Sequence, residues 1–176
     1  GPQARPTRAP RASIRPYTAY MVKCPDTGFG LAFAIHRGVA DYIKDATAEV
    51  VIGAAIKVHR ALGPGLLEST YQTCLVYELM QRGLRVRREV AVPVVYEGVS
   101  LDCGYRLDLF VEDHLIVEVK CVEHLMPIHT AQVLTYLRLT GARLALLLNF
   151  NSLTLKAGLR TFVRQGNEVP HTPWEG

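Results

Sequence analysis

The strongest constraint on the fold is a change in the spacing of the apolar residues near Gly83. Before this glycine they recur every three or four positions, which predicts two helices interrupted by Gly63-Pro64-Gly65. After it, apolar and polar residues alternate, which predicts strands. The two helical stripes consist of Val50, Val51, Ala54, Val58 and Leu62, and of Leu67, Tyr71, Leu75 and Leu79.

The second half of the chain predicts a mixed sheet. Its strands are expected, in order, around Val90, Val92 and Val94, at residues 101–111, 115–121 and 144–148, and more weakly at 159–164. Turns are expected at Glu97-Gly98 and at residues 112–114, and a helix between Pro127 and Gly141. This succession predicts an α/β fold with a mixed central sheet flanked by helices.

Positive charge is concentrated at the start of the chain. Residues 1–25 contain five basic residues and no acidic one, so that, with a formal net charge of +4 for the whole chain, the remainder carries −1. We predict a flexible, basic extension rich in Pro and Arg over 1–45, a folded domain over 46–165 and a C-terminal tail over 166–176. A transit peptide is the alternative for the extension. The near-neutral domain offers little bulk charge to attract a polyanion.

The four cysteines point to an intracellular protein. They do not show the C-x-x-C spacing of zinc ribbons and redox dithiols, and a chain of 176 residues is long enough to do without disulfides. The chain also contains no apolar run of the length that a membrane-spanning helix needs. We therefore predict a cytoplasmic protein with reduced thiols and no membrane association.

The third predicted strand carries the residues of greatest chemical interest. Alternation places Glu118 and Lys120 on one face of the strand, opposite an apolar face. If this strand forms a hairpin with the preceding one, Asp108 lies close to both. Two carboxylates can hold a divalent cation, and a nearby lysine can orient water and stabilise charge on a phosphate. A surface ion pair between Glu118 and Lys120 is the structural alternative.

Together with residues on either side, these positions resemble a known pattern. Gly104-x-x-x-Asp108, Glu118-x-Lys120 and Gln132-x-x-x-Tyr136 resemble the PD-(D/E)XK nuclease superfamily in its RecB-like form. The segment from Gly65 to Tyr71 resembles the signature of the GxxExxY family within it, and flanking similarity extends the resemblance over about residues 46–164. The resemblance implies a restriction-endonuclease-like core.

The resemblance also implies a role for each matching residue. Asp108 and Glu118 would bind Mg²⁺ or Mn²⁺, together with the Val119 carbonyl and with Glu68 from the second helix. Lys120 would be the catalytic lysine. The remaining motif residues, Gln132 and Tyr136, would support the site or contact phosphate.

Several of these residues also have purely structural explanations. Glu68 lies in the first turn of a helix, where the helix dipole favours a carboxylate. Tyr71 belongs to the apolar stripe, and Gly104 fits a close approach of the backbone. Asp102 shares a face with Asp108, so alternation alone would allow either residue to be the acid of the site.

The resulting prediction is a metal-dependent nuclease that hydrolyses DNA with metal-activated water. The alternative is a catalytically silent module of the same fold that binds nucleic acid or a protein partner. A third hypothesis is a subunit of a larger assembly, with another protein or a second copy of the chain as its partner.

Overall fold

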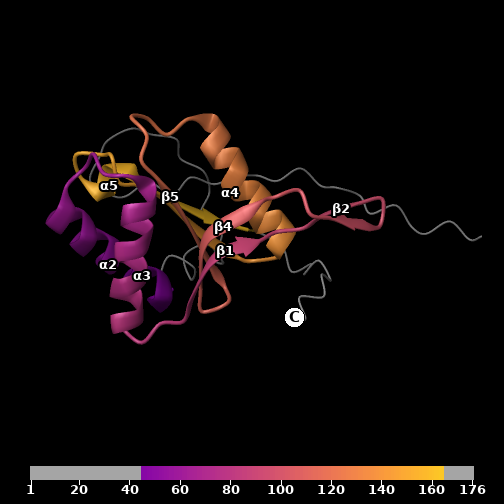
Figure 1. The fold of residues 1–176 in the computed structure, drawn as a ribbon, viewed down its shortest axis with the longest axis horizontal. Helices are drawn as coiled ribbons and strands as arrows, with labels where there is room; N and C mark the ends of the chain where they lie inside the picture. The colour runs from indigo at the N-terminus through magenta and orange to yellow at the C-terminus, as the bar shows by residue number, and fades with distance from the viewer. Residues whose placement is uncertain (1–44, 165–176) are drawn as a thin grey trace, which may run out of the picture.

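The computed structural model describes residues 45–164, in which helices cover both faces of a sheet (Figure 1). The helices are α2 (Ala46–Leu62), α3 (Glu68–Gln81), α4 (Pro127–Thr140) and the short α5 (Leu155–Gly158). The strands are β1 (Val86–Ala91), β2 (Val94–Tyr96), β3 (Val99–Leu101), β4 (Arg106–Val111), β5 (Leu115–Lys120), β6 (Leu144–Asn149) and β7 (Leu159–Val163). The predicted tail 166–176 and the predicted extension, apart from Asp45, lie outside the described residues.

Five strands form the central sheet in the order β1-β4-β5-β6-β7. Within the described part of the chain, only the pair β5–β6 is parallel, and α4 makes the crossover between these two strands. The other neighbouring pairs are antiparallel. This confirms the predicted mixed sheet flanked by helices. Strands β2 and β3 form a separate hairpin that extends away from the sheet (Figure 1).

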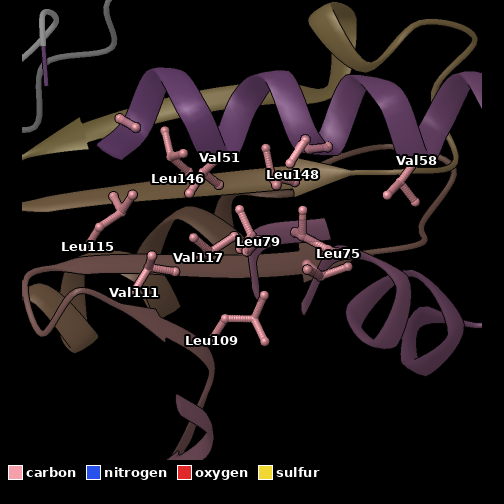
Figure 2. Close-up of a cluster of buried hydrophobic side chains, with 14 of the residues drawn as sticks. Val51, Val58, Leu75, Leu79, Leu109, Val111, Leu115, Val117, Leu146 and Leu148 are labelled. Atoms are coloured by element: carbon pink, nitrogen blue, oxygen red, sulfur yellow. The ribbon is translucent and has the colours of Figure 1, made fainter. Parts of the chain in front are cut away.

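One face of the sheet packs against α2 and α3. The apolar stripes of both helices meet the odd-numbered side chains of β5, as Figure 2 shows for Val51, Leu75 and Val117. Strand β6 is buried along its whole length between β5 and β7, which explains why it is apolar on both faces. Leu67 does not join the helical stripe, because it precedes α3 and is 76% exposed.

The opposite face packs against α4. Its cluster includes Val133 and Leu137 from the helix, Ile116 and Leu147 from the central strands, and Phe162 from β7. Pro127 begins α4, and Gly141 follows its last residue with φ +73°, so both predicted helix boundaries are confirmed. Within residues 45–164, no helix has the length and apolarity that crossing a bilayer requires.

Two predicted strands are wrong in their extent. The strand expected around Val90, Val92 and Val94 is divided, because β1 ends at Ala91 and β2 begins after Pro93, which has no N–H to continue a ladder. The strand expected over 101–111 is also divided between β3 and β4. Residues 102–105 belong to neither strand, and Gly104 among them has a φ of +72°. Helix α5 was not predicted.

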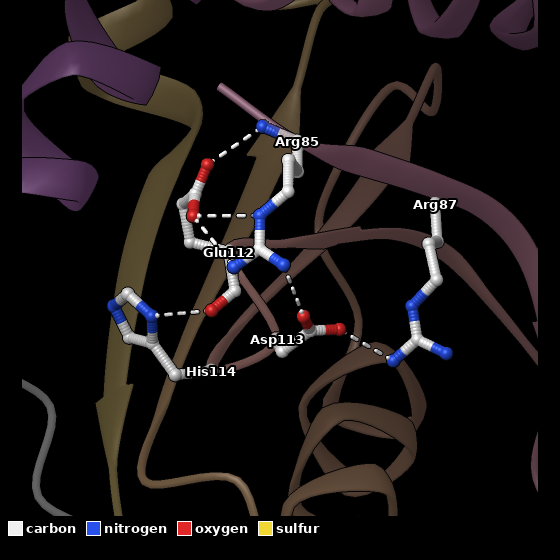
Figure 3. Close-up of polar contacts among 5 residues, drawn as sticks. All are labelled: Arg85, Arg87, Glu112, Asp113 and His114. Carbon is white, nitrogen blue, oxygen red and sulfur yellow. Dashed lines mark hydrogen bonds and ion pairs between the residues drawn. The ribbon is translucent and has the colours of Figure 1, made fainter. Parts of the chain in front are cut away.

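The turn between β4 and β5 is held by charged side chains (Figure 3). Glu112 accepts a hydrogen bond from the backbone N–H of Arg85 at 2.6 Å and pairs with its guanidinium. Asp113 pairs with Arg85 and Arg87. His114 lies 3.2 Å from the carboxylate of Asp45, which caps α2. These contacts join the turn to β1 and α2 at the end of β5 that is opposite to Lys120.

Candidate functional site

Strands β4 and β5 separate where the candidate site begins. Their antiparallel ladder ends at the pair Leu109–Val117, and Asp108 and Glu118 are the next residues of the two strands beyond that pair. The N–H of Val119 donates to Oδ2 of Asp108 at 2.7 Å instead of to a strand carbonyl. In a strand, the N–H and C=O of one residue point to the same side. The Val119 carbonyl therefore points to the edge on which Asp108 lies.

Glu118 is the most deeply buried acidic group of the described residues. It is 1% exposed, and its Oε1 accepts a hydrogen bond from Nζ of Lys120 at 2.7 Å. Its Oε2 is buried and has no hydrogen-bond partner among residues 45–164. A buried carboxylate oxygen without a partner is costly, and it usually indicates a ligand or a functional role. The ion pair between Glu118 and Lys120 that the structural alternative expects is present, but it is largely buried and does not lie on the surface.

Burial changes the titration of both carboxyl groups. Desolvation raises the pKa of Asp108 to about 6, although the hydrogen bond from Val119 and the charge of Lys120 act in the opposite direction. Desolvation and the neighbouring charge of Asp108 raise the pKa of Glu118 to about 7. Two acids that resist ionisation beside each other form a site that a cation would stabilise.

Lys120 is held in its charged form. Burial by itself would lower the pKa of Lys120, but the charges of Glu118, Asp108 and Glu68 outweigh burial, so that the pKa is raised. A positive charge is thus available beside the carboxylates. It lies on the final residue of β5, next to the loop that leads to α4.

Helix α4 brings Gln132 and Tyr136 to the same side of the sheet as the acidic pair. Nε2 of Gln132 donates to the hydroxyl of Tyr136 at 2.9 Å. The ring of Tyr136 is 2% exposed and meets the half-exposed ring of Tyr105 edge to face, with 6.4 Å between centroids. Burial is the main cause of a raised pKa for Tyr136, and the charges of Glu118 and Asp108 add to it.

Helix α3 brings Glu68 near the site from the other face of the sheet. Glu68 is the first residue of the helix and is half-buried. Its charge contributes to the raised pKa values of Asp108 and Glu118. It therefore lies within electrostatic reach of both carboxyl groups, and its place in the first turn is also where the helix dipole favours an acid.

Tyr71, in contrast, is a structural residue. Its side chain is fully buried and stacks on Phe150, with ring centroids 4.5 Å apart. Its hydroxyl donates to the carbonyl of Gly63 and accepts a hydrogen bond from the N–H of Leu66. These bonds hold the loop that precedes Glu68.

The donor set fits a hard divalent cation with incomplete protein coordination. Asp108, Glu118 and the Val119 carbonyl offer oxygen ligands on neighbouring strands. Among residues 45–164, no three His, Cys, Asp or Glu side chains are grouped closely enough to hold a metal ion. In this arrangement Glu68 does not join Asp108 and Glu118 in such a group, and its role as a metal ligand stays a prediction. Mg²⁺ commonly keeps several water ligands in such sites.

Several other polar residues and Gly104 lie away from the acidic pair or serve the fold. Asp102 lies outside β4 and bonds the N–H of Gly104. Gly104 is needed for its positive φ rather than for close approach, because a Cβ at this position would meet no atom within 4 Å. His59 is buried and bonds the carbonyl of Ser152 at 2.8 Å, and His129 bonds the N–H of Met126.

Asn149 is a supporting residue that was not predicted. It is buried at the end of β6, and its amide both accepts from the N–H and donates to the carbonyl of Val122. The N–H of Phe150 donates to the carbonyl of Lys120. Together these bonds hold the chain that follows the lysine. The sequence did contain a signal for this role, because Asn149 is a polar residue at the end of an otherwise apolar strand.

The comparisons with known proteins agree with this arrangement. The family model described as PD-(D/E)XK nuclease superfamily matches residues 45–162. The chain therefore belongs to the PD-(D/E)XK nuclease superfamily. Neither the curated proteins nor the solved structures that were compared with the chain gave a match.

Proposed function

We propose that this protein is a metal-dependent nuclease of the GxxExxY branch and that it hydrolyses phosphodiester bonds of DNA. The observation that carries the proposal is the buried, unpartnered Oε2 of Glu118 beside Asp108 and Lys120. A carboxylate pair with raised pKa values is unfavourable by itself, but it becomes favourable when a cation is bound.

Asp108, Glu118 and the Val119 carbonyl would hold Mg²⁺ or Mn²⁺. When bound, the cation would polarise the phosphate and make water a better nucleophile at neutral pH. Lys120 is charged and can donate to a phosphate oxygen, where negative charge develops in the transition state. Water would attack phosphorus in line, and the bond to the leaving sugar oxygen would break as the new bond to water oxygen forms. The attacking water would lose a proton, and the leaving sugar oxygen would take one up from solvent.

The residues of α4 have a supporting role in this proposal. The hydrogen bond from Gln132 orients the hydroxyl of Tyr136, whose O–H can donate to a phosphate oxygen. Glu68 acts through its charge, which favours cation binding without direct ligation. A cytoplasmic location and a protein or homodimer partner stay predictions from the sequence.

The test is a cleavage assay on labelled single- and double-stranded DNA and RNA with Mg²⁺ or Mn²⁺. Wild type is compared with Lys120→Ala and with the matched control Lys156→Ala, which changes an exposed lysine of α5. Cleavage by wild type and control that is lost in Lys120→Ala supports the proposal, and the panel identifies the substrate. Cleavage that survives Lys120→Ala contradicts it. If no protein cleaves any polymer while wild type binds one, the silent binding module is favoured.

A further inference from the structure

Tyr105 carries an exposed aromatic ring at the edge of the candidate site. The residue immediately precedes β4, and 46% of its surface is exposed. Its ring meets the ring of Tyr136 edge to face, with 6.4 Å between the centroids and 78° between the ring planes. At this angle one ring covers at most one face of the other. At least one face of the Tyr105 ring is therefore not covered by Tyr136.

The contact with Tyr136 places this ring on the side of the sheet that carries the acidic pair. Tyr136 packs in the α4 cluster with Ile116 of β5. Ile116 and Glu118 are two residues apart on that strand, so their side chains share one face. Asp108 follows Tyr105 by three residues, which an extended chain spans in at most about 11 Å. A single bound strand of nucleic acid can therefore contact both the acidic pair and the exposed ring.

The backbone at Tyr105 is held in place although residues 102–105 belong to neither strand. The N–H of Val92 donates to the carbonyl of Tyr105 at 2.8 Å. Before it, the N–H of Gly104 donates to Oδ1 of Asp102 at 3.0 Å. A tyrosine has two side-chain torsions, so it loses little conformational entropy when it contacts a ligand. The exposed ring is thus a preorganised flat surface beside the site.

An exposed tyrosine alone does not indicate a ligand, because single exposed apolar residues are common. Tyr77 is 63% exposed and illustrates this case, since it lies on α3, which packs against the other face of the sheet. Tyr105 differs in two respects. Its ring contacts a residue of the candidate site, and it lies on the face of the sheet where a phosphate would bind.

The group that fits a flat aromatic surface beside a phosphate is a nucleobase. Every base has a π face, so stacking on tyrosine tolerates any sequence. In a duplex these faces are occupied by the neighbouring bases, whereas an unpaired base can turn toward the protein. Nucleotides of a stacked strand are about 3.4 Å apart, so the span of about 11 Å corresponds to about three nucleotides.

We propose that Tyr105 is a substrate-binding residue whose ring stacks on an unpaired nucleobase within about three nucleotides of the scissile phosphate. The inference rests on the proposed function and deepens it, because it names single-stranded or locally unpaired DNA as the substrate. The stack forms in the bound substrate and is kept in the transition state. Its loss should therefore raise KM and leave kcat unchanged.

The experiment measures KM and kcat for cleavage of a labelled single-stranded DNA oligonucleotide by the 176-residue protein. Stacking of one base on an aromatic ring corresponds to about a 5- to 150-fold change in affinity. We expect Tyr105→Ala to raise KM by a factor in this range with the kcat of wild type. Tyr105→Phe keeps the ring and should retain the KM of wild type, as should the control Tyr77→Ala, which removes an exposed ring elsewhere.

Abasic substrates separate stacking from a structural role of the ring. Each substrate lacks one base, at one of the positions on either side of the cleaved bond. For wild type, KM should rise when the base that stacks on Tyr105 is missing. Tyr105→Ala should be insensitive to the loss of that same base. If wild type and Tyr105→Ala respond alike at every position, the ring does not contact a base and the inference is overturned.

Tyr105→Leu tests whether packing against Tyr136 explains the effect. Leucine keeps an apolar contact but has no flat face, so its KM should be raised as in Tyr105→Ala. A wild-type KM in Tyr105→Leu or Tyr105→Ala overturns the inference and leaves the proposed function intact. A lower wild-type KM for a fully paired duplex than for the single strand does the same. If wild type cleaves no DNA, the proposed function and the inference are both overturned.

Discussion

The carboxylate of Asp108 accepts a hydrogen bond from the backbone N–H of Val119 at 2.7 Å, at the point where the β4–β5 ladder ends. One side chain thus replaces a backbone partner and also serves as a proposed metal ligand. These two roles differ in what they require. The hydrogen bond needs an acceptor oxygen, whereas binding of a cation needs a negative charge.

Asp108→Asn should therefore separate the two roles. Its amide oxygen can still accept from Val119, so we expect near-wild-type unfolding by urea together with loss of Mn²⁺ binding and cleavage. Asp108→Ala should also lose about 1–3 kcal/mol of stability, because the N–H of Val119 is left without a partner. Asp102→Asn is the control. Equal unfolding by the Asn and Ala variants would contradict the structural role of this hydrogen bond.

The raised carboxyl pKa values predict how stability depends on pH without divalent cations. Asp108 titrates at about 6 and Glu118 at about 7 in the folded protein, above their values in an unfolded chain. The folded state thus binds more protons near neutral pH, so their contribution is complete below about pH 4 and is lost as the pH rises through 6 and 7. We expect a loss on the order of 2–4 kcal/mol between about pH 5 and 8.

Urea unfolding in the presence of a chelator measures this dependence. The double variant Asp108→Asn, Glu118→Gln removes both titrating groups, so its stability should decline less over the same pH range than that of wild type. The comparison subtracts the contribution of groups elsewhere in the chain. A decline of the same size in both proteins would show that neither carboxyl has a raised pKa.

Tyr71→Phe should destabilise the protein without removing a core ring. The phenylalanine can still stack on Phe150, but the loop loses its bonds at Gly63 and Leu66. We expect a loss of about 1–2 kcal/mol in urea unfolding. Tyr77→Phe, which changes a tyrosine of the same helix that is 63% exposed, is the control and should change little. A loss shared by both variants would contradict the proposed restraint of the loop before Glu68.

Asn149→Ala tests the support of the chain that follows Lys120. The substitution leaves both the N–H and the carbonyl of Val122 without their partner. We expect about 1–3 kcal/mol of destabilisation for each group that stays buried and unsatisfied, together with lower cleavage because Lys120 is less well held. Asn151→Ala, at an exposed position nearby, should resemble wild type. Full activity in Asn149→Ala would remove the proposed link to the lysine.

The parts of the site that follow from local periodicity could be predicted from the sequence. Glu118 and Lys120 interrupt an apolar strand at a spacing of two, which places both on one face before any partner strand is known. Gln132 and Tyr136 are four apart on a helix, and they form a hydrogen bond in the structure. In these cases the geometry depends only on the element that contains the residues.

The remaining features depend on how distant segments pair. The division of the predicted strand at Pro93 has a local cause in the missing N–H, but the separate pairing of β2 with β3 depends on how the segments meet. Asn149 gains its role from contacts with Val122, which precedes it by an entire helix.

The short connection between β4 and β5 has a consequence for the order of folding. Closing a tight turn costs little chain entropy, so we expect the hairpin with Asp108, Glu118 and Lys120 to form before β6 pairs with β5 through the longer α4 crossover. In the early hairpin the acidic groups are still hydrated and ionise as they do in free peptides. We expect the pKa values of these carboxyl groups to rise only when β6 and the helices exclude water. The raised pKa values would therefore appear late in folding, when the packing of the domain is complete.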